Sequence, residues 1–251
     1  MNQGSTLIKD IRARRVYDSR GRPTVEAEVT LECGALGRAI APAGASRGSR
    51  EAVDLRDGGR RSGGHDVVQA VATVNFVIRN ALLGREAMEQ TDIDARLVAL
   101  DGTPNKARLG GNATVAVSLA VAHAAARARE LPLWKHLAGE GEVTLPMPEI
   151  QIFGGGAHAH RALDLQDLMV MPVGALSFAD ALHGVSDVYR AAGELLADAG
   201  KLCGVADEGG YWPRFASNAE ALDLLMRSIE RAGLSPGTDM AISLDVAASE
   251  L

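Results

Sequence analysis

The sequence predicts an α/β protein in two parts, an α+β first domain followed by the beginning of a (β/α) barrel. Three features support this fold class. Apolar and polar residues alternate over 24–32, helical spacing dominates residues 67–130, and apolar runs alternate with helices toward the C-terminus. Glycines and charged residues cluster at 139–142, so we expect one domain over 1–140 and a partial barrel domain over 141–251.

The first domain should begin with a small antiparallel meander. Residues 8–16 form a plausible strand, the alternating run 24–32 forms a half-buried one, and residues 38–41 would pair back as a hairpin strand. The residues that face one way in the alternating run are Val25, Ala27, Val29 and Leu31. The flexible run 41–51 lacks large apolar residues, so it indicates either a surface loop or a lid that closes over a substrate.

Three helices are expected next, over about 67–82, 93–100 and 112–130, because apolar residues recur there at helical spacing. The third is rich in alanine, with Val115, Leu119 and Ala122 on one face. These helices would form a layer packed against the small sheet.

The strongest functional signal is the stretch 202–210. A short apolar run, typical of a buried strand in a parallel sheet, ends there in acids and glycines that include Glu208. A second apolar run ends in Asp245, and a capping box that starts at Ser217 opens the helix between the two runs. Strand, helix and strand with acids at the strand ends is the geometry of a barrel's active face. An ordinary βαβ unit with solvated loop acids is the alternative.

Other strands are expected over 145–153 and 165–170, and a helix over 177–199. The second of these strands carries Gln166 and Asp167. With about four strand candidates in a domain that needs about eight to close, we expect an incomplete barrel. The chain would then be a fragment, or a partner would supply the rest.

Composition excludes several classes of function. The chain has 251 residues, 47% hydrophobic, and a net charge of -6 without a basic patch suited to nucleic acid. It has neither an apparent signal peptide nor a run long enough to span a bilayer, so no membrane role is expected. The two cysteines lie far apart in sequence and suggest no disulfide framework, which fits a cytoplasmic protein.

Carboxylates dominate the candidate chemistry. A barrel would bring Asp167, Glu208 and Asp245 to one mouth, where they could bind a divalent cation or transfer protons. Oxygen donors without a Cys/His cluster favour Mg²⁺ over Zn²⁺. His158 follows three glycines and either contacts an anionic substrate or is an ordinary loop residue. Ser46 either offers its hydroxyl to a cation or phosphate, or is a generic loop serine.

Several ordered segments resemble the enolase (phosphopyruvate hydratase) family over nearly the whole chain. They are Tyr-Asp-Ser-Arg-Gly (17–21), Pro-Thr-Val-Glu (23–26), Gly-Ala-Ser (44–46), Leu-Asp-Gly-Thr-Pro-Asn-Lys (100–106), Val-Ser-Leu-Ala (117–120), Gly-Gly-Ala-His-Ala (155–159), Asp-Glu-Gly-Gly (207–210) and Leu-Asp-Val-Ala-Ala-Ser-Glu (244–250). The resemblance implies an α+β N-terminal domain followed by an enolase-type barrel whose first elements depart from simple alternation.

The resemblance also implies a lyase of glycolysis that dehydrates 2-phosphoglycerate to phosphoenolpyruvate with Mg²⁺. Asp245 matches the first metal ligand, and Ser46 matches the lid serine that ligates the second ion. Glu208 matches the carboxylate that assists departure of the substrate hydroxyl.

Further resemblance-based assignments concern the substrate and the partner. His158 matches a histidine of the closing loop region, and Gln166 matches a glutamine beside the site. Asp167 stands where the family has glutamate, so its contact to the catalytic carboxylate is open. A homodimer is implied, with Arg20 resembling an interface residue.

Some residues of the family's active site are not found in this sequence and others are replaced, so the resemblance leaves the activity open. The family's lysine base, two metal carboxylates and the phosphate-binding arginine would fall beyond residue 251, so we expect impaired activity in this truncated chain. Extra arginines at Arg22, Arg47 and Arg214 suggest a more anionic ligand. The alternatives are an enolase-like transferase of phosphonate biosynthesis, resembling carboxyphosphonoenolpyruvate synthase, and a non-catalytic fragment that binds a partner.

Overall fold

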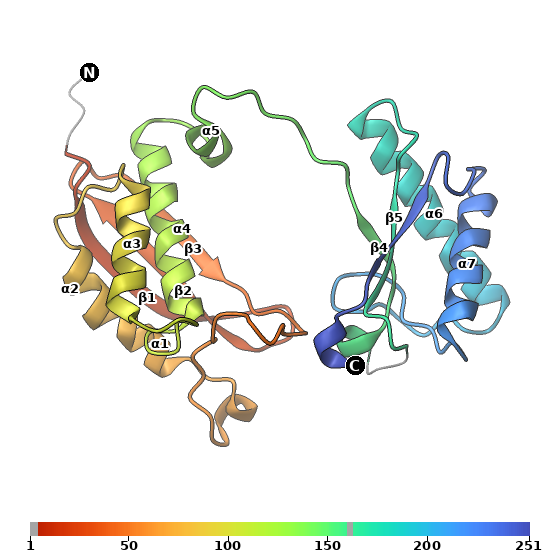
Figure 1. The fold of residues 1–251 in the computed structure, drawn as a ribbon, viewed down its shortest axis with the longest axis horizontal. Coiled ribbons are helices and arrows are strands. Elements are labelled where there is room, and N and C mark those ends of the chain that lie inside the picture. The colour runs from red at the N-terminus through yellow and green to blue at the C-terminus, as the bar shows by residue number, and fades with distance from the viewer. Residues whose placement is uncertain (1–4, 160–162) are drawn as a thin grey trace. The chain divides into compact units, whose positions relative to one another are not determined.

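The computed structural model describes residues 5–159 and 163–251, which divide into two compact units (Figure 1). Residues up to 44 and residues 50–143 form the first unit. Residues 45–49 and the described part of 144–251 form the second. In the described residues, no helix combines the length and apolar character needed to cross a membrane.

The first unit contains the predicted meander. Strands β1 (Ile8–Tyr17), β2 (Pro23–Leu31) and β3 (Leu36–Ala41) form an antiparallel sheet in that order. The predicted inward-facing residues of β2 are fully buried: Val25, Ala27, Val29 and Leu31. The alternation in this run therefore correctly identified the core face of the sheet.

Helices cover one face of this sheet (Figure 1). Helices α1 (Val68–Ala72), η2 (Thr73–Ile78), α2 (Arg79–Leu82) and α4 (Gly111–Ala128) contact the sheet, and α3 (Gln90–Asp101) and α5 (Leu133–Ala138) pack on α4. The short turn η1 (Arg61–Gly64) lies in the loop before α1. The predicted helix over 67–82 contains a π-helical segment, η2, whose Asn75 side chain bonds both backbone groups of Ala13 in β1. Tertiary hydrogen bonding thus accompanies the local departure from α-helix.

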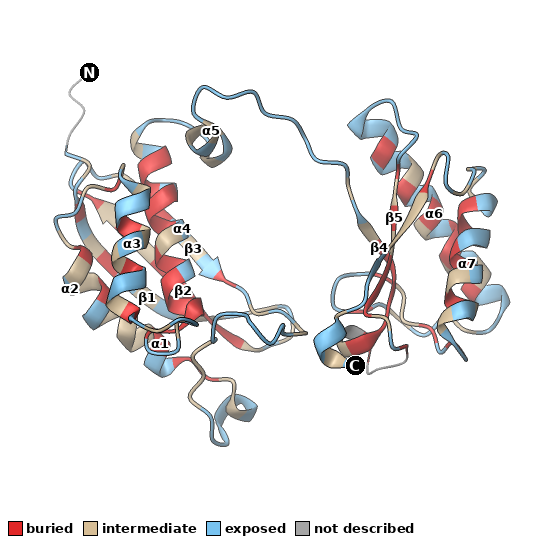
Figure 2. Ribbon diagram, viewed as in Figure 1, coloured by how far each residue is buried: buried red, intermediate tan, exposed pale blue. Residues whose placement is uncertain are grey.

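Helix α4 lies very close to the sheet. Buried residues run along its length (Figure 2), yet Val115 and Leu119 are 48% and 40% exposed. Its packing face consists of small residues because the backbone of β3 leaves no space: a Cβ at Gly37 would overlap backbone atoms of Ala120 and Ala124. The two large apolar residues of the predicted face therefore point away from the core.

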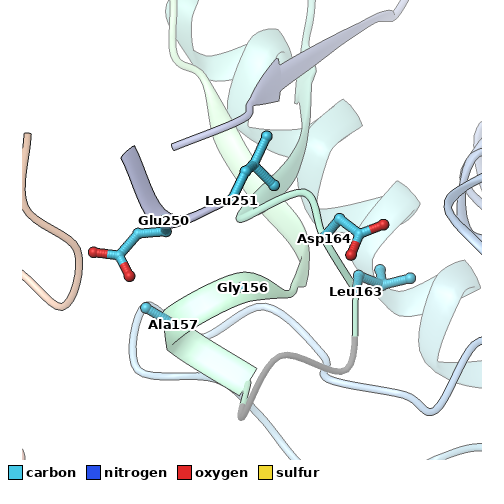
Figure 3. A pocket seen from close by; sticks show the side chains of 6 residues that line it. All are labelled: Gly156, Ala157, Leu163, Asp164, Glu250 and Leu251. Carbon is cyan, nitrogen blue, oxygen red and sulfur yellow. The ribbon is translucent and has the colours of Figure 1, made fainter. Parts of the chain in front are cut away.

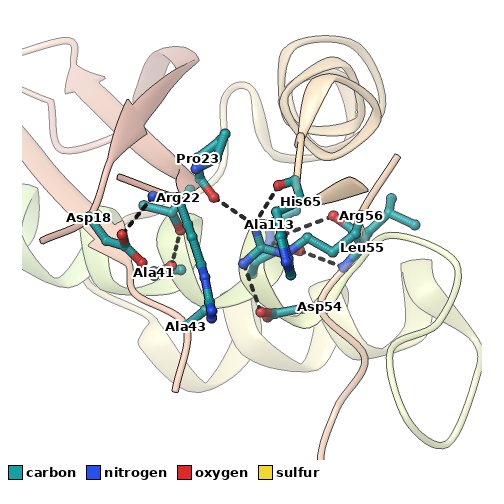
Figure 4. A network of polar contacts seen from close by, with 12 residues as sticks. Asp18, Arg22, Pro23, Ala41, Ala43, Asp54, Leu55, Arg56, His65 and Ala113 are labelled. Carbon is teal, nitrogen blue, oxygen red and sulfur yellow. Dashed lines mark hydrogen bonds and ion pairs between the residues drawn. The ribbon is translucent and has the colours of Figure 1, made fainter. Parts of the chain in front are cut away.

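Polar contacts tie the segment after β3 to the first unit (Figure 4). The Arg56 guanidinium donates to the carbonyls of Pro23 and His65 and to the Asp54 carboxylate. The Asn112 side chain at the start of α4 bonds both backbone groups of Leu55. The Asn112 bonds satisfy the backbone of Leu55, which lies in a stretch without helix or strand.

The second unit is built on β4 (Ile150–Gly154), β5 (Asp167–Met171) and β6 (Ala241–Asp245), which pair antiparallel in the order β4-β5-β6. The described residues form no closed barrel, which confirms the predicted incomplete one. The predicted buried parallel strand at 202–206 is wrong: Leu202 and Val205 are 50% and 56% exposed. Val205 forms an isolated antiparallel bridge with Tyr211, and no named strand of the described residues includes this stretch.

Helices α6 (Phe178–Asp198) and α7 (Asn218–Arg231) pack on each other and on the sheet, and short 3₁₀ turns η3 (Gly156–Ala159) and η4 (Ala248–Glu250) lie in the loops. Both predicted helix starts are confirmed, because Ser177 accepts the Asp180 amide and Ser217 accepts the Glu220 amide. The core includes Phe153 edge-on to Phe215 at 5.3 Å between ring centroids.

Candidate active site

Two of the predicted carboxylates meet at one end of the second unit's sheet. Asp167 begins β5 and Asp245 ends β6, and the two residues are paired across the antiparallel ladder. The Gln166 amide donates to the Asp245 carbonyl at 3.0 Å and extends the ladder by one bond. Antiparallel pairing, instead of the expected parallel strands, therefore brings these acids together.

Gln166 joins the two carboxylates. Its Nε2 lies 3.0 Å from Asp245 Oδ2 and 3.5 Å from Asp167 Oδ2. The residue is only 5% exposed, and its Oε1 has no hydrogen-bond partner among the described residues. A buried acceptor without a donor is costly to a fold unless a ligand or water supplies the donor. Gln166 is therefore suited to receive a hydrogen bond from a bound molecule.

Asp245 is exposed and keeps free acceptor capacity. Its Oδ2 accepts from Gln166, and its Oδ1 accepts the Ala247 amide at 2.9 Å. A carboxylate offers about four lone-pair sites, so these two bonds orient the group without saturating it. Asp245 can accordingly contribute to a cation or substrate site.

Glu208 lies exposed in a tight turn over residues 206–210. The Ala206 amide donates to the Gly210 carbonyl at 2.6 Å and the Gly209 amide to the Ala206 carbonyl at 3.0 Å. Gly209 has a φ of +95°, which disfavours any side chain there. The turn is thus a defined platform for the acid instead of a strand end.

The turn is fastened to its surroundings on two sides. Tyr211, which follows it, exchanges backbone bonds of 2.8 Å with Ile152 and Gly154 of β4. Tyr189 of α6 stacks on Tyr211 at 4.4 Å and donates its hydroxyl to the Gly209 carbonyl at 2.8 Å. Burial raises the pKa of Tyr189 above its ordinary value, so this hydroxyl keeps its proton at neutral pH.

Gln151 is a site residue that the sequence reasoning missed. Its Oε1 accepts the Gly210 amide at 2.8 Å, and its Nε2 donates to Asp167 Oδ1. The available signal was a polar residue inside an otherwise apolar strand run. Its two bonds link the turn that carries Glu208 to the carboxylate pair.

Ser46 is not brought into this cluster, and the structure does not describe the side chain of His158. Ser46 is half-buried within residues 45–49, and among the described residues it makes no hydrogen bond to a carboxylate. The neighbouring Arg47 amide lies 3.4 Å from Glu250 Oε1. The backbone of His158 belongs to η3, but its side chain lies outside the described residues.

A hollow of about 340 Å³ lies beside η3 and η4 (Figure 3). Gly156, Ala157, Leu163, Asp164, Glu250 and Leu251 line it. Glu250 belongs to η4 and Asp164 to the loop before β5, and their carboxylates point in opposite directions (Figure 3). None of the described residues that line it is basic, so these residues alone do not make an anion site.

The described residues supply too few ligands to bind a divalent cation on their own. Within residues 5–159 and 163–251, no three His, Cys, Asp or Glu residues stand close enough to hold a metal ion. Asp245 is one suitable ligand, whereas both oxygens of Asp167 already face side-chain amides. The described residues therefore supply part of a Mg²⁺ site and do not complete it.

Comparison with protein-family models covers nearly the whole chain. The model of the enolase N-terminal domain matches residues 8–137. The model of the enolase C-terminal TIM barrel domain matches residues 142–251.

Proposed function

The chain belongs to the enolase family, and from this membership we propose that its site dehydrates 2-phosphoglycerate to phosphoenolpyruvate in a Mg²⁺-dependent lyase reaction of glycolysis in the cytoplasm. One observation carries the proposal. Gln166 and Asp245, which match the family, form one hydrogen-bonded cluster with Asp167, and Gln151 connects this cluster to the turn of Glu208. The substrate in this proposal is a small phosphorylated acid.

Glu208 is proposed to assist the departing hydroxyl. Loss of hydroxide from carbon is slow unless a positioned acid supplies a proton, and such a group contributes about 10²–10⁴-fold to the rate. Glu208 stands on an anchored turn and is exposed, so a substrate can reach it. Gln166, with its unpaired buried Oε1, is proposed to accept a hydrogen bond from the substrate, and His158 to contact it from η3.

Mg²⁺ supplies charge stabilisation for an enediolate when it is bound, as the enolase superfamily illustrates in general terms. Asp245 is the proposed ligand in this chain, and Ser46 is proposed to join on closure of its loop. Because the described residues do not complete the site, no catalytic step is assigned to the ion here.

The proton-abstracting base is also unassigned. The described part of the second unit contains one lysine, Lys201. Its ammonium group donates to Glu220 near the start of α7. It is therefore engaged away from the carboxylate cluster. Loss of a positioned base lowers a rate by about a hundredfold or more, so we propose a correspondingly weak activity.

The test is turnover of 2-phosphoglycerate by the purified chain, followed through the ultraviolet absorbance of the enol product. We expect slow product formation that requires Mg²⁺ and stops on chelation. Glu208→Gln should abolish it, whereas Glu230→Gln, an exposed acid on α7, should leave it unchanged. Turnover that is absent, or equal in wild type and Glu208→Gln, would contradict the proposal.

Two other outcomes identify the alternatives. Formation of a phosphonate product without dehydration would favour an enolase-like transferase of phosphonate biosynthesis. A chain that orders only with a second polypeptide would favour a non-catalytic fragment.

A homodimer is also proposed on the family resemblance, and light scattering of the purified chain tests it. Arg20 already donates to the Ala43 carbonyl and faces Asp18 at 3.5 Å, so at an interface it would act partly through these residues.

A further inference from the structure

We infer that Gln151 is a positioning residue that holds the acid-bearing turn, residues 206–210, against Asp167 and so sets where Glu208 stands relative to Asp245. Gln151 lies in β4 and is only 8% exposed. Its effect on catalysis rests on the proposed function, but the coupling between the turn and Asp167 belongs to the fold and can be measured without turnover.

The two ends of the Gln151 amide have partners of opposite character. Its Oε1 accepts from the Gly210 backbone amide at 2.8 Å, and its Nε2 donates to the Asp167 carboxylate. A backbone N–H only donates and an ionised carboxylate only accepts, so both partners require the same orientation of the amide. Gly210 and Asp167 are themselves buried, so water cannot freely replace either bond.

Two glycines make room for this side chain. A Cβ at Gly210 would lie 2.5 Å from Gln151 Oε1 and 2.8 Å from its Cγ. A Cβ at Gly154 would lie 2.5 Å from the Ala206 Cβ and 3.4 Å from Gln151 Nε2. The turn therefore rests directly on the Gln151 side chain, and its distance from β4 is set by contact as well as by hydrogen bonds.

The link continues to the other candidate carboxylate. Asp167 Oδ2 lies 3.5 Å from Gln166 Nε2, which also donates to Asp245 Oδ2 at 3.0 Å. One chain of side-chain bonds thus runs from the Gly210 amide to Asp245, through Gln151, Asp167 and Gln166. A shift at Gln151 would move the turn while leaving the bond between Gln166 and Asp245 in place.

The combined length of the Gln151 and Asp167 side chains fixes the gap that they span. A shorter side chain at position 151 separates the amide from the Asp167 carboxylate, and a longer side chain at position 167 crowds the amide. Moving one methylene from position 151 to position 167, by Gln151→Asn with Asp167→Glu, keeps the sum constant, so the longer acid can reach the shortened amide while that amide stays on Gly210. The inference therefore predicts rescue: each single variant disturbs the turn, and the double variant restores it.

The experiment measures hydrogen exchange of the Gly210 amide in the full chain by NMR, for wild type, both single variants and the double variant. We expect exchange to accelerate about tenfold or more in each single variant and to return to within about threefold of wild type in the double variant. Gln90→Asn is the control, because Gln90 in the first unit also donates to an aspartate, Asp94, at 3.1 Å. It should leave Gly210 unchanged.

Turnover of 2-phosphoglycerate supplies the second readout. A displaced acid lowers kcat more than it raises KM, and both should recover in the double variant. Additive effects in the double variant, or Gly210 exchange that ignores Gln151→Asn, would overturn the inference. If a single variant does not fold, a folded double variant supports the inference and an unfolded one overturns it.

The two proposals fail in different ways. If wild type shows no turnover but Gly210 exchange follows the rescue pattern, the proposed function is wrong and the coupling stands. If turnover is present and depends on Glu208, while exchange shows no rescue, the proposed function stands and the role of Gln151 is wrong.

Discussion

Replacing Gln166 by methionine should separate stability from activity. Methionine matches glutamine in length and is apolar, so Gln166→Met removes the amide without changing the volume much. The hydrogen bond to Asp245 at 3.0 Å is lost, but Asp245 is exposed and water can take over this bond. The contact to Asp167 Oδ2 is also lost, but at 3.5 Å it is long and contributes little. A hydrogen bond to a charged group contributes about 1.5–3 kcal/mol, and the bond to Asp245 should fall at the low end.

The same change also removes an unfavourable feature. Gln166 Oε1 is buried and has no partner among the described residues, and a buried unpaired acceptor costs about 1–3 kcal/mol. The loss and the gain nearly cancel, so the free energy of unfolding should stay within about 1 kcal/mol of wild type. Turnover of 2-phosphoglycerate should nevertheless fall by about tenfold or more, because the substrate loses a hydrogen-bond acceptor.

Gln151→Met is the matched control, since it makes the same substitution at a similarly buried glutamine whose two polar atoms are both paired. It should destabilise the protein by about 3 kcal/mol, because the Gly210 amide and the Asp167 carboxylate both lose a partner. Urea titration followed by Trp212 fluorescence reports the second unit once Trp134, 58% exposed in the first unit, is changed to phenylalanine. Equal destabilisation by both methionine variants would refute the reasoning, because it would mean that Gln166 Oε1 is not an unpaired acceptor.

Three further predictions concern stability, each measured by urea or thermal denaturation. Gly37→Ala should destabilise the protein by about 3 kcal/mol or more, because the added Cβ would meet the backbone of α4. Gly184→Ala in α6 has room, with its nearest neighbours at 3.5 Å, and should stabilise the protein by about 0.5–1 kcal/mol. Similar effects of the two substitutions would contradict the packing argument. Ser217→Ala should cost about 1 kcal/mol by removing the cap of α7, and an unchanged midpoint would argue against that cap. Burial raises the pKa of Asp101, but hydrogen bonds from Thr103 and the Leu109 amide outweigh it and leave the pKa below its usual 3.8. The ionised Asp101 carboxylate therefore adds to the free energy of unfolding above pH 3.8, and this addition is lost as the pH falls through the lower pKa of the folded state. The stability difference between wild type and Asp101→Asn should accordingly shrink on acidification. A difference that grows would show that the pKa is shifted the other way.

Local patterns predicted the first unit well. The alternation that buries Val25 and Leu31 is a property of β2 itself, and the serine caps of α6 and α7 involve residues within one turn. The face of α4 was harder to predict. The orientation of α4 depends on how closely β3 approaches it at Gly37. The spacing of apolar residues within the helix does not predict this distance.

The second unit shows where sequence reasoning stops. The acids Asp167 and Asp245 were identified as candidates, but their pairing depends on the antiparallel direction of β5 and β6, which an apolar run does not specify. The stretch ending at Glu208 resembled a buried strand, yet its bonds fold it into a turn against β4. Gln151 remained unnoticed because its importance comes from two partners far away in the chain.

Among the described residues of the second unit, strand β6 has one neighbour in its sheet, β5. Its other side presents backbone donors and acceptors that nothing in that sheet occupies, close to Leu244 and Val246, which are 41% and 40% exposed. Such a border is a template on which a further strand can be added. Purification at low concentration, with self-association followed by sedimentation velocity, is therefore part of any sound measurement on this chain.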